Sequence, residues 1–316
     1  MSAARPPAGD PLGPDLAVRV GRLRLPNPIL CASGTFGYGT ENPEAAARLG
    51  GIVTKTITRE PRAGNAPPRI VETPSGMLNS IGLQNVGVER FLAEKLPGLR
   101  ALGVPLVVSV GGRSEEDFDA VVARLDEAEG IDAYELNVSC PNVKEGGIEF
   151  CQVPSAAAAV IARARKRTSR PLWAKLSPNV TSIGTLARAC AESGADALTA
   201  INTFVGMAVD LRTRRPVLPG VTGGLSGPAI RPLALARVRE VVRSVSIPIV
   251  AVGGIVTGRD ALEFLLVGAR AVQIGTAHFL RPDQGSVAAE EIRRFLAAEG
   301  IAGVEAWIGT LQEGDR

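Results

Sequence analysis

The sequence predicts a (β/α)8 TIM barrel, a ring of eight parallel strands that alternate with helices. Apolar runs alternate with helical segments along most of the chain, and strict alternation of this kind implies parallel pairing. The runs are continuously apolar, which is typical of strands buried on both faces. A doubly wound open sheet is the alternative, but its first βα loop would carry GxGxxG. Residues 34–39 read GTFGYG and do not match, so the barrel is favoured.

Eight strands and eight helices account for this pattern. The expected strands span residues 28–32, 51–56, 105–110, 132–139, 171–176, 195–201, 248–252 and 271–275. The expected helices span residues 42–49, 88–102, 115–129, 155–168, 183–193, 228–245, 259–267 and 286–298. Before the first strand, residues 16–20 and 22–25 alternate around Gly21, which predicts a short N-terminal β-hairpin that plugs the bottom of the barrel.

Composition bounds the domain organisation. The chain has 316 residues with 45% hydrophobic and 21% charged residues, which is typical of a globular protein with a sizeable core. Residues 1–14 are rich in Pro, Ala and Gly and lack a long apolar segment, so they resemble neither a secretory signal nor a membrane anchor. We expect a disordered tail over residues 1–14 and a single barrel domain over residues 15–316.

Charge and cysteine usage argue against several classes of partner. The 35 basic and 32 acidic residues are interspersed, and aromatic residues make up 4% of the chain, so neither a nucleic-acid patch nor a stacking platform is expected. The four cysteines show no CxxC spacing and His278 is the single histidine. We therefore expect no metal site and no disulfide framework, and a cytoplasmic location.

Polar residues gather where the expected strands end, and in a barrel the C-terminal strand ends carry the catalytic groups. Cys140 follows the fourth strand in the hexapeptide NVSCPN, residues 137–142, where Pro141 stops the strand and displays the thiol. An inert buried thiol is the equal alternative. Lys55 and Lys175 close apolar strands. Each forms either a structural ion pair or a cation that faces the electron-rich edge of a flavin.

Glycines and asparagines also lie at the expected strand ends and in the long loops. Gly253-Gly254 and Gly275-Thr276 follow the last two strands, where barrels commonly bind a phosphate through backbone N–H groups, although plain turns would also use glycine. Four asparagines lie at strand ends or in long loops, namely Asn79, Asn137, Asn142 and Asn202. Their amides offer a donor and an acceptor on one plane, as a cyclic imide requires, although asparagine is also a common turn residue.

These motifs together resemble the dihydroorotate dehydrogenases, and within them the class 1B catalytic subunit. The resemblance extends from LPNP at residues 25–28 to GTA at residues 275–277 and covers nearly the whole expected domain. The motifs that carry it are ASGTFG (32–37), SGMLNSIGLQN (75–85), ELNVSCPNVK (135–144), KLSPNV (175–180), INT (201–203), TGGLSGPA (222–229) and GG (253–254).

The resemblance implies an enzyme with one FMN per chain that oxidises (S)-dihydroorotate to orotate in pyrimidine biosynthesis. By position, Cys140 would remove the C5 proton while hydride passes from C6 to the flavin. The implied substrate-binding residues are Lys55, Asn79, Ser80, Ile81, Gly82, Leu83, Asn137, Asn142, Asn202 and Thr203. The implied cofactor-binding residues are Ala32, Ser33, Gly34, Lys55, Thr56, Ser109, Asn137, Lys175, Ile201, Gly227, Gly253, Gly254, Gly275 and Thr276.

Class 1B membership also implies partners. It predicts a homodimer that binds a second subunit to form a heterotetramer. The second subunit carries FAD and an iron–sulfur cluster and passes electrons to NAD. The four unclustered cysteines do not provide ligands for such a cluster here. The alternatives are a class 1A enzyme that uses fumarate, an FMN enzyme of a related dihydropyrimidine, and a non-enzymatic flavin-binding protein.

Three positions depart from the expected family pattern. Ser109 and His278 stand where asparagine is more usual, and Cys151 adds a second thiol to the loop after Cys140. We expect an altered flavin contact at Ser109 and a structural, hydrogen-bonding role for His278.

The loop over residues 141–154 is long enough to act as a lid.

Overall fold

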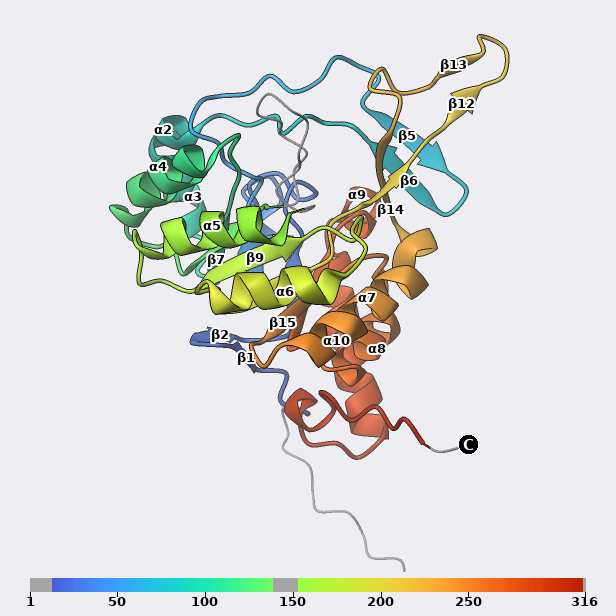
Figure 1. The fold of residues 1–316 in the computed structure, drawn as a ribbon. Helices are drawn as coiled ribbons and strands as arrows, with labels where there is room; N and C mark the ends of the chain where they lie inside the picture. The colour runs from blue at the N-terminus through green and yellow to red at the C-terminus, as the bar shows by residue number, and fades with distance from the viewer. Residues whose placement is uncertain (1–12, 139–152, 315–316) are drawn as a thin grey trace, which may run out of the picture.

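A computed structural model describes residues 13–138 and 153–314 of the protein. Its centre is a closed barrel of eight parallel strands (Figure 1). In chain order the strands are β3 (Ile29–Cys31), β4 (Gly51–Val53), β7 (Leu106–Val110), β8 (Ala133–Leu136), β9 (Leu172–Leu176), β10 (Ala197–Ala200), β15 (Ile249–Val252) and β16 (Ala271–Ile274). Each lies inside the range expected for it, so the predicted barrel is confirmed.

Helices connect the barrel strands, and the expected helical ranges are found with small shifts at their ends. They are α1 (Pro43–Ala46), α2 (Val88–Arg90), η1 (Phe91–Lys95), α3 (Leu96–Arg100), α4 (Glu115–Asp126), α5 (Pro154–Arg165), α6 (Ile183–Glu192), η2 (Pro228–Ile230), α7 (Arg231–Ser244), α8 (Gly258–Leu266), α9 (Ala277–Leu280), α10 (Gln284–Ala298) and η3 (Val304–Ala306). The segment expected as one helix over residues 88–102 is divided into α2, η1 and α3. Pro97 near the start of α3 lacks the N–H group that a continuous α-helix would use.

The predicted N-terminal hairpin is confirmed and lies at the N-terminal end of the barrel. Strands β1 (Val18–Val20) and β2 (Leu23–Leu25) pair antiparallel, and Gly21 turns between them with φ +60°. Arg22 donates to the Ser169 carbonyl at 2.6 Å, and Arg270 donates to the Arg19 carbonyl at 3.4 Å. Ser169 and Arg270 precede β9 and β16, so the hairpin covers the end of the barrel at which the strands begin.

Two small antiparallel sheets were not expected from the sequence. Four short strands form one of them in the order β11 (Phe204–Gly206), β14 (Gly223–Ser226), β6 (Gly76–Asn79) and β5 (Ile70–Thr73). Strands β12 (Val209–Asp210) and β13 (Arg215–Pro216) form the other. They arise from the long connections after β4 and β10, and Figure 1 shows them at the opposite end from β1 and β2. They therefore extend the end at which the catalytic groups are expected.

Helix starts are fixed by side chains that match the sequence. Ser114 and Ser182 accept hydrogen bonds from backbone N–H groups in the first turns of α4 and α6. Thr257 and Asp260 form a reciprocal capping box at α8, which satisfies donors that a helix leaves unpaired. Across residues 13–138 and 153–314, no helix has the length and apolar character that crossing a membrane requires.

Candidate active site

The C-terminal ends of the barrel strands bring predicted site residues together from distant parts of the chain. Lys175 in β9 donates from Nζ to Ser33 Oγ at 3.2 Å, after β3. Asn202, after β10, donates from Nδ2 to Asn137 Oδ1 at 3.3 Å, after β8. In a closed ring of eight strands β3 and β9 stand opposite one another. The Lys175 side chain therefore spans the mouth of the barrel.

The unexpected sheet joins the asparagines into one continuous array. The Asn202 side chain accepts from the Thr203 N–H at 2.8 Å. Gly224 packs directly on Thr203, because a Cβ atom at Gly224 would lie 2.2 Å from Thr203 Oγ1. Asn79 donates to the Gly224 carbonyl at 3.2 Å. Asn137, Asn202 and Asn79 are thus linked, whereas the predicted Asn142 and Cys140 lie outside the described residues, as does most of the loop expected as a lid.

The segment from Ser80 to Leu83 is held in an unusual backbone conformation. Gly82 has φ +75° and Leu83 has φ +56°, and positive φ is uncommon for leucine. The buried Asn85 side chain accepts from the N–H groups of Thr58 and Gly87 and donates to Thr58 Oγ1 and the Leu83 carbonyl. Asn85 therefore fixes the backbone that the resemblance assigns to the substrate. Sequence reasoning gave Asn85 no role.

Lys55 differs from a structural lysine, because it forms no ion pair with any residue that the structure describes. Its side chain is half-buried and forms no hydrogen bond or ion pair with residues 13–138 or 153–314. Burial lowers the pKa of Lys55, and the positive charge of Arg69 lowers it further. Residues 13–138 and 153–314 thus provide no ion-pair partner for Lys55. A half-buried ammonium group beside an arginine favours an anionic or strongly accepting ligand.

Lys175 differs, because the expected ion pair is present. Its Nζ lies 3.6 Å from Glu135 Oε1. Glu135 is fully buried, and Lys175 is 4% exposed. The ammonium group also reaches Ser33 Oγ. Lys175 therefore forms an ion pair in the barrel interior, and its ammonium group also reaches the mouth of the barrel at Ser33.

The departure at Ser109 has a structural consequence. Ser109 is fully buried, and its hydroxyl lies 3.0 Å from the Thr56 hydroxyl. The Ser109 N–H also donates to Thr54 Oγ1 at 3.1 Å. A ligand in the mouth would meet Thr56, which retains some exposed surface, before Ser109. The pair of hydroxyls therefore favours Thr56 as the direct contact.

The predicted glycine loops converge at the start of α7. Gly254 has φ +75°, and a Cβ atom there would lie 2.7 Å from the Arg231 backbone N. Thr276 donates to the Ser226 hydroxyl at 2.9 Å, beside Gly227. Gly254 and Gly227, two positions with no side chain, thus lie close to the start of α7, which fits a phosphate bound by backbone N–H groups. Arg231 itself pairs with Asp260 and Glu263.

The other residues predicted to bind the cofactor lie at the C-terminal ends of β3, β10, β15 and β16. Ile201 is buried, with its Cγ1 3.6 Å from a Cβ position at Gly253. Ala32 Cβ lies 3.5 Å from the corresponding position at Gly275. Gly34 follows with φ +79°. The end of β3 and the ends of β10, β15 and β16 thus form a wall that begins at Ser33 and extends to the start of α7.

The described thiols are unsuited to catalysis. Burial raises the pKa of Cys31 and that of Cys190 to about 12, so both remain protonated at neutral pH and are poor nucleophiles. Cys140 and Cys151 fall between residues 138 and 153, outside the described chain. Among the described residues, no three or more His, Cys, Asp or Glu side chains cluster as a metal site would require.

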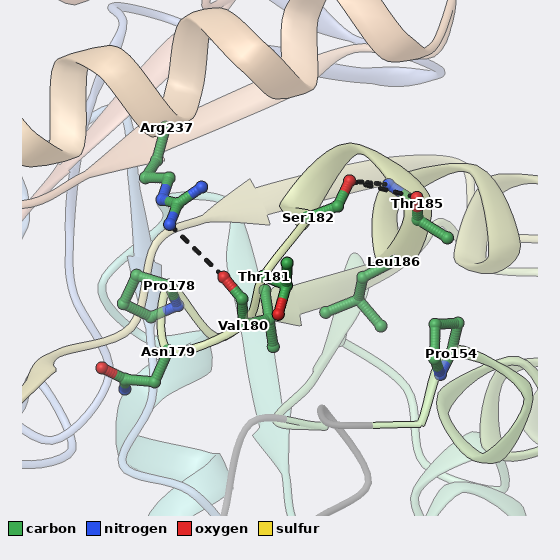
Figure 2. Close-up of a pocket in the computed structure, with 9 residues that line it drawn as sticks. All are labelled: Pro154, Pro178, Asn179, Val180, Thr181, Ser182, Thr185, Leu186 and Arg237. Carbon is green, nitrogen blue, oxygen red and sulfur yellow. Dashed lines mark hydrogen bonds between the residues drawn. The ribbon is translucent and has the colours of Figure 1, made fainter.

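A cavity of about 760 Å³ lies beside the loop after β9 and the start of α6 (Figure 2). Its lining includes Asn179 and Arg237, but none of the predicted site residues. Asn179 donates to the Thr203 carbonyl and accepts from the Val205 N–H, both at 3.0 Å. We regard the cavity as distinct from the site, and Asn179 as the residue that holds the Thr203 loop. Asn179 and Asn85 both fall inside motifs that the sequence displayed, yet only their partners revealed their roles.

Comparison with known proteins agrees with this geometry. The family model described as dihydroorotate dehydrogenase matches residues 15–298. The chain belongs to the dihydroorotate dehydrogenase family. A protein of Geobacter sp. (strain M21) is 50% identical over 95% of this chain and 99% of its own length. One of Geobacter sulfurreducens is 51% identical over the same shares. Both are named dihydroorotate dehydrogenase B (NAD(+)), catalytic subunit, so the family recognised from the motifs is confirmed.

His278 is buried, three residues after Gly275, which the family resemblance assigns to the cofactor site. Its Nδ1 is 3.0 Å from the Ile274 carbonyl, so Nδ1 carries the proton, and its ring meets Phe36 edge-on with centroids 4.8 Å apart. Burial lowers the pKa of His278 to about 4. The ring is neutral at physiological pH, which suits the structural role expected for it.

We predict that replacing Asn85 destabilises the fold. In Asn85→Ala the buried N–H groups of Thr58 and Gly87 lose their acceptor, and each unsatisfied buried group costs about 1–3 kcal/mol. The free energy of unfolding, measured by urea denaturation, should fall by about 3 kcal/mol. Asn65→Ala is the matched control, because Asn65 is exposed and bonds only Ser80 through its side chain. Equal losses in the two variants would contradict the role of Asn85.

We predict a pH dependence of stability that comes from His278. Its pKa in the folded protein, about 4, lies below the ordinary value of about 6.5. As pH falls below 6.5 the unfolded chain binds the proton first, so folding stability is lost down to pH 4. Between pH 7.5 and pH 4.5 the wild type should lose about 2–3 kcal/mol more than His278→Asn in urea denaturation. Parallel pH profiles for the two proteins would contradict this assignment.

Proposed function

We propose that this protein oxidises dihydroorotate to orotate as the catalytic subunit of an NAD-linked dihydroorotate dehydrogenase in pyrimidine biosynthesis. The observation that carries the proposal is the linked array from Asn137 through Asn202 and Thr203 to Asn79. Planar amides of this kind match the alternating N–H and C=O groups of a dihydropyrimidine ring. Relatives that carry this catalytic-subunit name are about half identical to the chain.

We propose FMN as the cofactor, one per chain, on the wall between Ser33 and the start of α7. Gly227, Gly253, Gly254, Gly275 and Thr276 would hold the phosphate through the backbone. Ala32, Ser33, Gly34, Lys55, Thr56, Ser109, Asn137, Lys175 and Ile201 would surround the ring system, with Ser109 acting through Thr56. Bound FMN would supply the acceptor for the hydride lost from C6 of the substrate. The cation of Lys175 suits the electron-rich edge of that acceptor.

The substrate would lie between the asparagines and the Ser80–Leu83 segment. The half-buried backbone of Ile81, Gly82 and Leu83, fixed by Asn85, would hold the carboxylate. Lys55 would add a positive charge there, because its ammonium group has no acidic partner among the described residues. The second half of the ring would contact Asn142, whose assignment rests on the NVSCPN motif.

Cys140 would act as the base at C5. A free thiol has a pKa of about 8.5, so the site must lower this value or work with a small thiolate fraction. The C5 proton would move to the Cys140 sulfur, and from there to solvent after the product leaves. Cys31 and Cys190 cannot substitute, since burial keeps both thiols protonated.

We further propose a single domain over residues 15–316 and a cytoplasmic location. The electron-transfer partner would be a separate subunit that carries FAD and an iron–sulfur cluster. This chain's sequence has four cysteines without cluster spacing, which supports a cluster on another subunit.

Cys140→Ala should abolish reduction of bound FMN by dihydroorotate. The flavin of the wild type should bleach when dihydroorotate is added without oxygen, whereas the variant should stay yellow with its FMN retained, because it lacks the base. Absorbance at the flavin band follows both. Cys31→Ala is the control and should bleach normally. Bleaching of the Cys140 variant at near wild-type rate would contradict the mechanism.

Reoxidation of the same bleached sample identifies the electron acceptor. NAD should restore the yellow colour when the FAD and iron–sulfur subunit is present. Reoxidation by fumarate without that subunit would instead indicate the class 1A reaction. Bleaching by dihydrouracil, and not by dihydroorotate, would indicate that the substrate is a different dihydropyrimidine.

We propose that the chain forms a homodimer through the β11–β13 region. This region exposes Val205, Met207, Val209 and Leu211, and exposed apolar side chains that gather on one segment are typical of an interface.

We predict that Leu211→Asp weakens this dimer, because a carboxylate buried in an interface is costly. Sedimentation should give a mass near 32.8 kDa for the variant and twice that for the wild type. Leu280→Asp, at an equally exposed position in α9, should remain dimeric. A monomeric wild type, or dissociation in the control variant, would contradict this interface.

A further inference from the structure

The interior of the barrel contains a buried carboxylate held from two strands. Glu135 in β8 is fully buried. Its Oε2 accepts from Thr199 Oγ1 at 2.8 Å and from Gln273 Nε2 at 2.6 Å. β8 and β16 are four places apart in the ring, so the Gln273 contact crosses the barrel. These two hydrogen bonds fix the orientation of the carboxylate.

The second oxygen of Glu135 faces Lys175. Glu135 Oε1 accepts no hydrogen bond from the described residues and lies 3.6 Å from Lys175 Nζ. The strand register pairs Glu135 with Trp173, so Lys175 lies two residues nearer the mouth. Its ammonium group is positioned between this carboxylate below and the Ser33 hydroxyl above.

The stability of the fold does not explain why Glu135 and Lys175 form a buried ion pair. Removing two charges from water is costly, and an apolar pair of the same volume is often equally stable or more stable. The ring also places Thr199 and Gln273 in the interior to hold Glu135, where most positions are apolar. An ion pair maintained in this way is better explained by its electrostatic effect at the mouth.

We propose that Glu135 is a positioning residue that holds Lys175 for the electron-rich edge of the flavin and neutralises part of the Lys175 charge. Glu135 thereby sets how readily the flavin accepts electrons. This inference rests on the proposed binding of FMN and on the ion pair between Glu135 and Lys175. Glu135 does not contact the flavin in this account. It acts through Lys175, whose uncompensated cation would otherwise stabilise the reduced, anionic flavin more strongly.

The affinity of bound FMN for sulfite tests the inference without turnover, because sulfite adds to the flavin ring and binds more tightly as positive charge near the ring increases. Glu135→Gln keeps the shape and removes the negative charge. The sulfite dissociation constant of the purified holoprotein should fall about tenfold in this variant, as expected for the loss of one nearby charge. The midpoint potential of the flavin should become more positive.

Two matched variants separate charge from shape. Thr199→Val removes one hydrogen bond to Glu135 and leaves both charges, and Glu135→Asp keeps the negative charge. Each should leave the sulfite dissociation constant within about threefold of the wild type. An unchanged constant in Glu135→Gln would overturn the inference, as would a tenfold fall in Glu135→Asp.

Lys175→Met decides the question if Glu135→Gln fails to retain FMN. With the ammonium group removed and Glu135 present, sulfite binding should weaken at least tenfold, and unchanged binding would overturn the inference. A wild type that binds no FMN would contradict the proposed function itself. A wild type that binds FMN and is bleached by dihydroorotate, with no response to these substitutions, would contradict only the role of Glu135.

Discussion

Closure of eight parallel strands into a ring is the constraint on which the rest of the structure depends. Because every strand points the same way, the chain returns to one mouth after each strand, and residues far apart in sequence become neighbours. Ser33 and Lys175 are 142 residues apart yet joined at 3.2 Å. The hairpin β1–β2 covers the opposite end of the ring. Chemistry is thereby confined to a single opening.

The mouth is completed by segments outside the ring. The sheet formed by β5, β6, β11 and β14 brings Asn79 to Gly224 and Gly224 to Thr203. Two asparagine side chains secure the surrounding loops: the buried Asn85 holds the Leu83 segment, and the exposed Asn179 holds the Thr203 loop. Each side chain uses both its amide nitrogen and its amide oxygen to hold the loop beside the site. Supporting hydrogen bonds of this kind keep a binding site rigid.

The barrel was predictable from the sequence because continuous apolar runs and glycine caps are local signals. The added sheet of β5, β6, β11 and β14 was not, since its strands are three or four residues long and three of them contain glycine, which weakens strand patterns. The site residues were predictable by position and resemblance, but not their environments. Lys55 and Lys175 look alike in sequence, yet among the residues that the structure describes Lys175 pairs with a carboxylate and Lys55 does not, because Glu135 is supplied by the strand next to that of Lys175.

A crystal structure of the protein with FMN and orotate tests the central claim most directly. The account predicts the FMN phosphate on the backbone at Gly227, Gly254 and Thr276, and the flavin ring above Lys175. It predicts orotate in contact with Asn79, Asn137 and Asn202. Orotate bound in the cavity beside Asn179, or a flavin placed away from Lys175, would contradict the account.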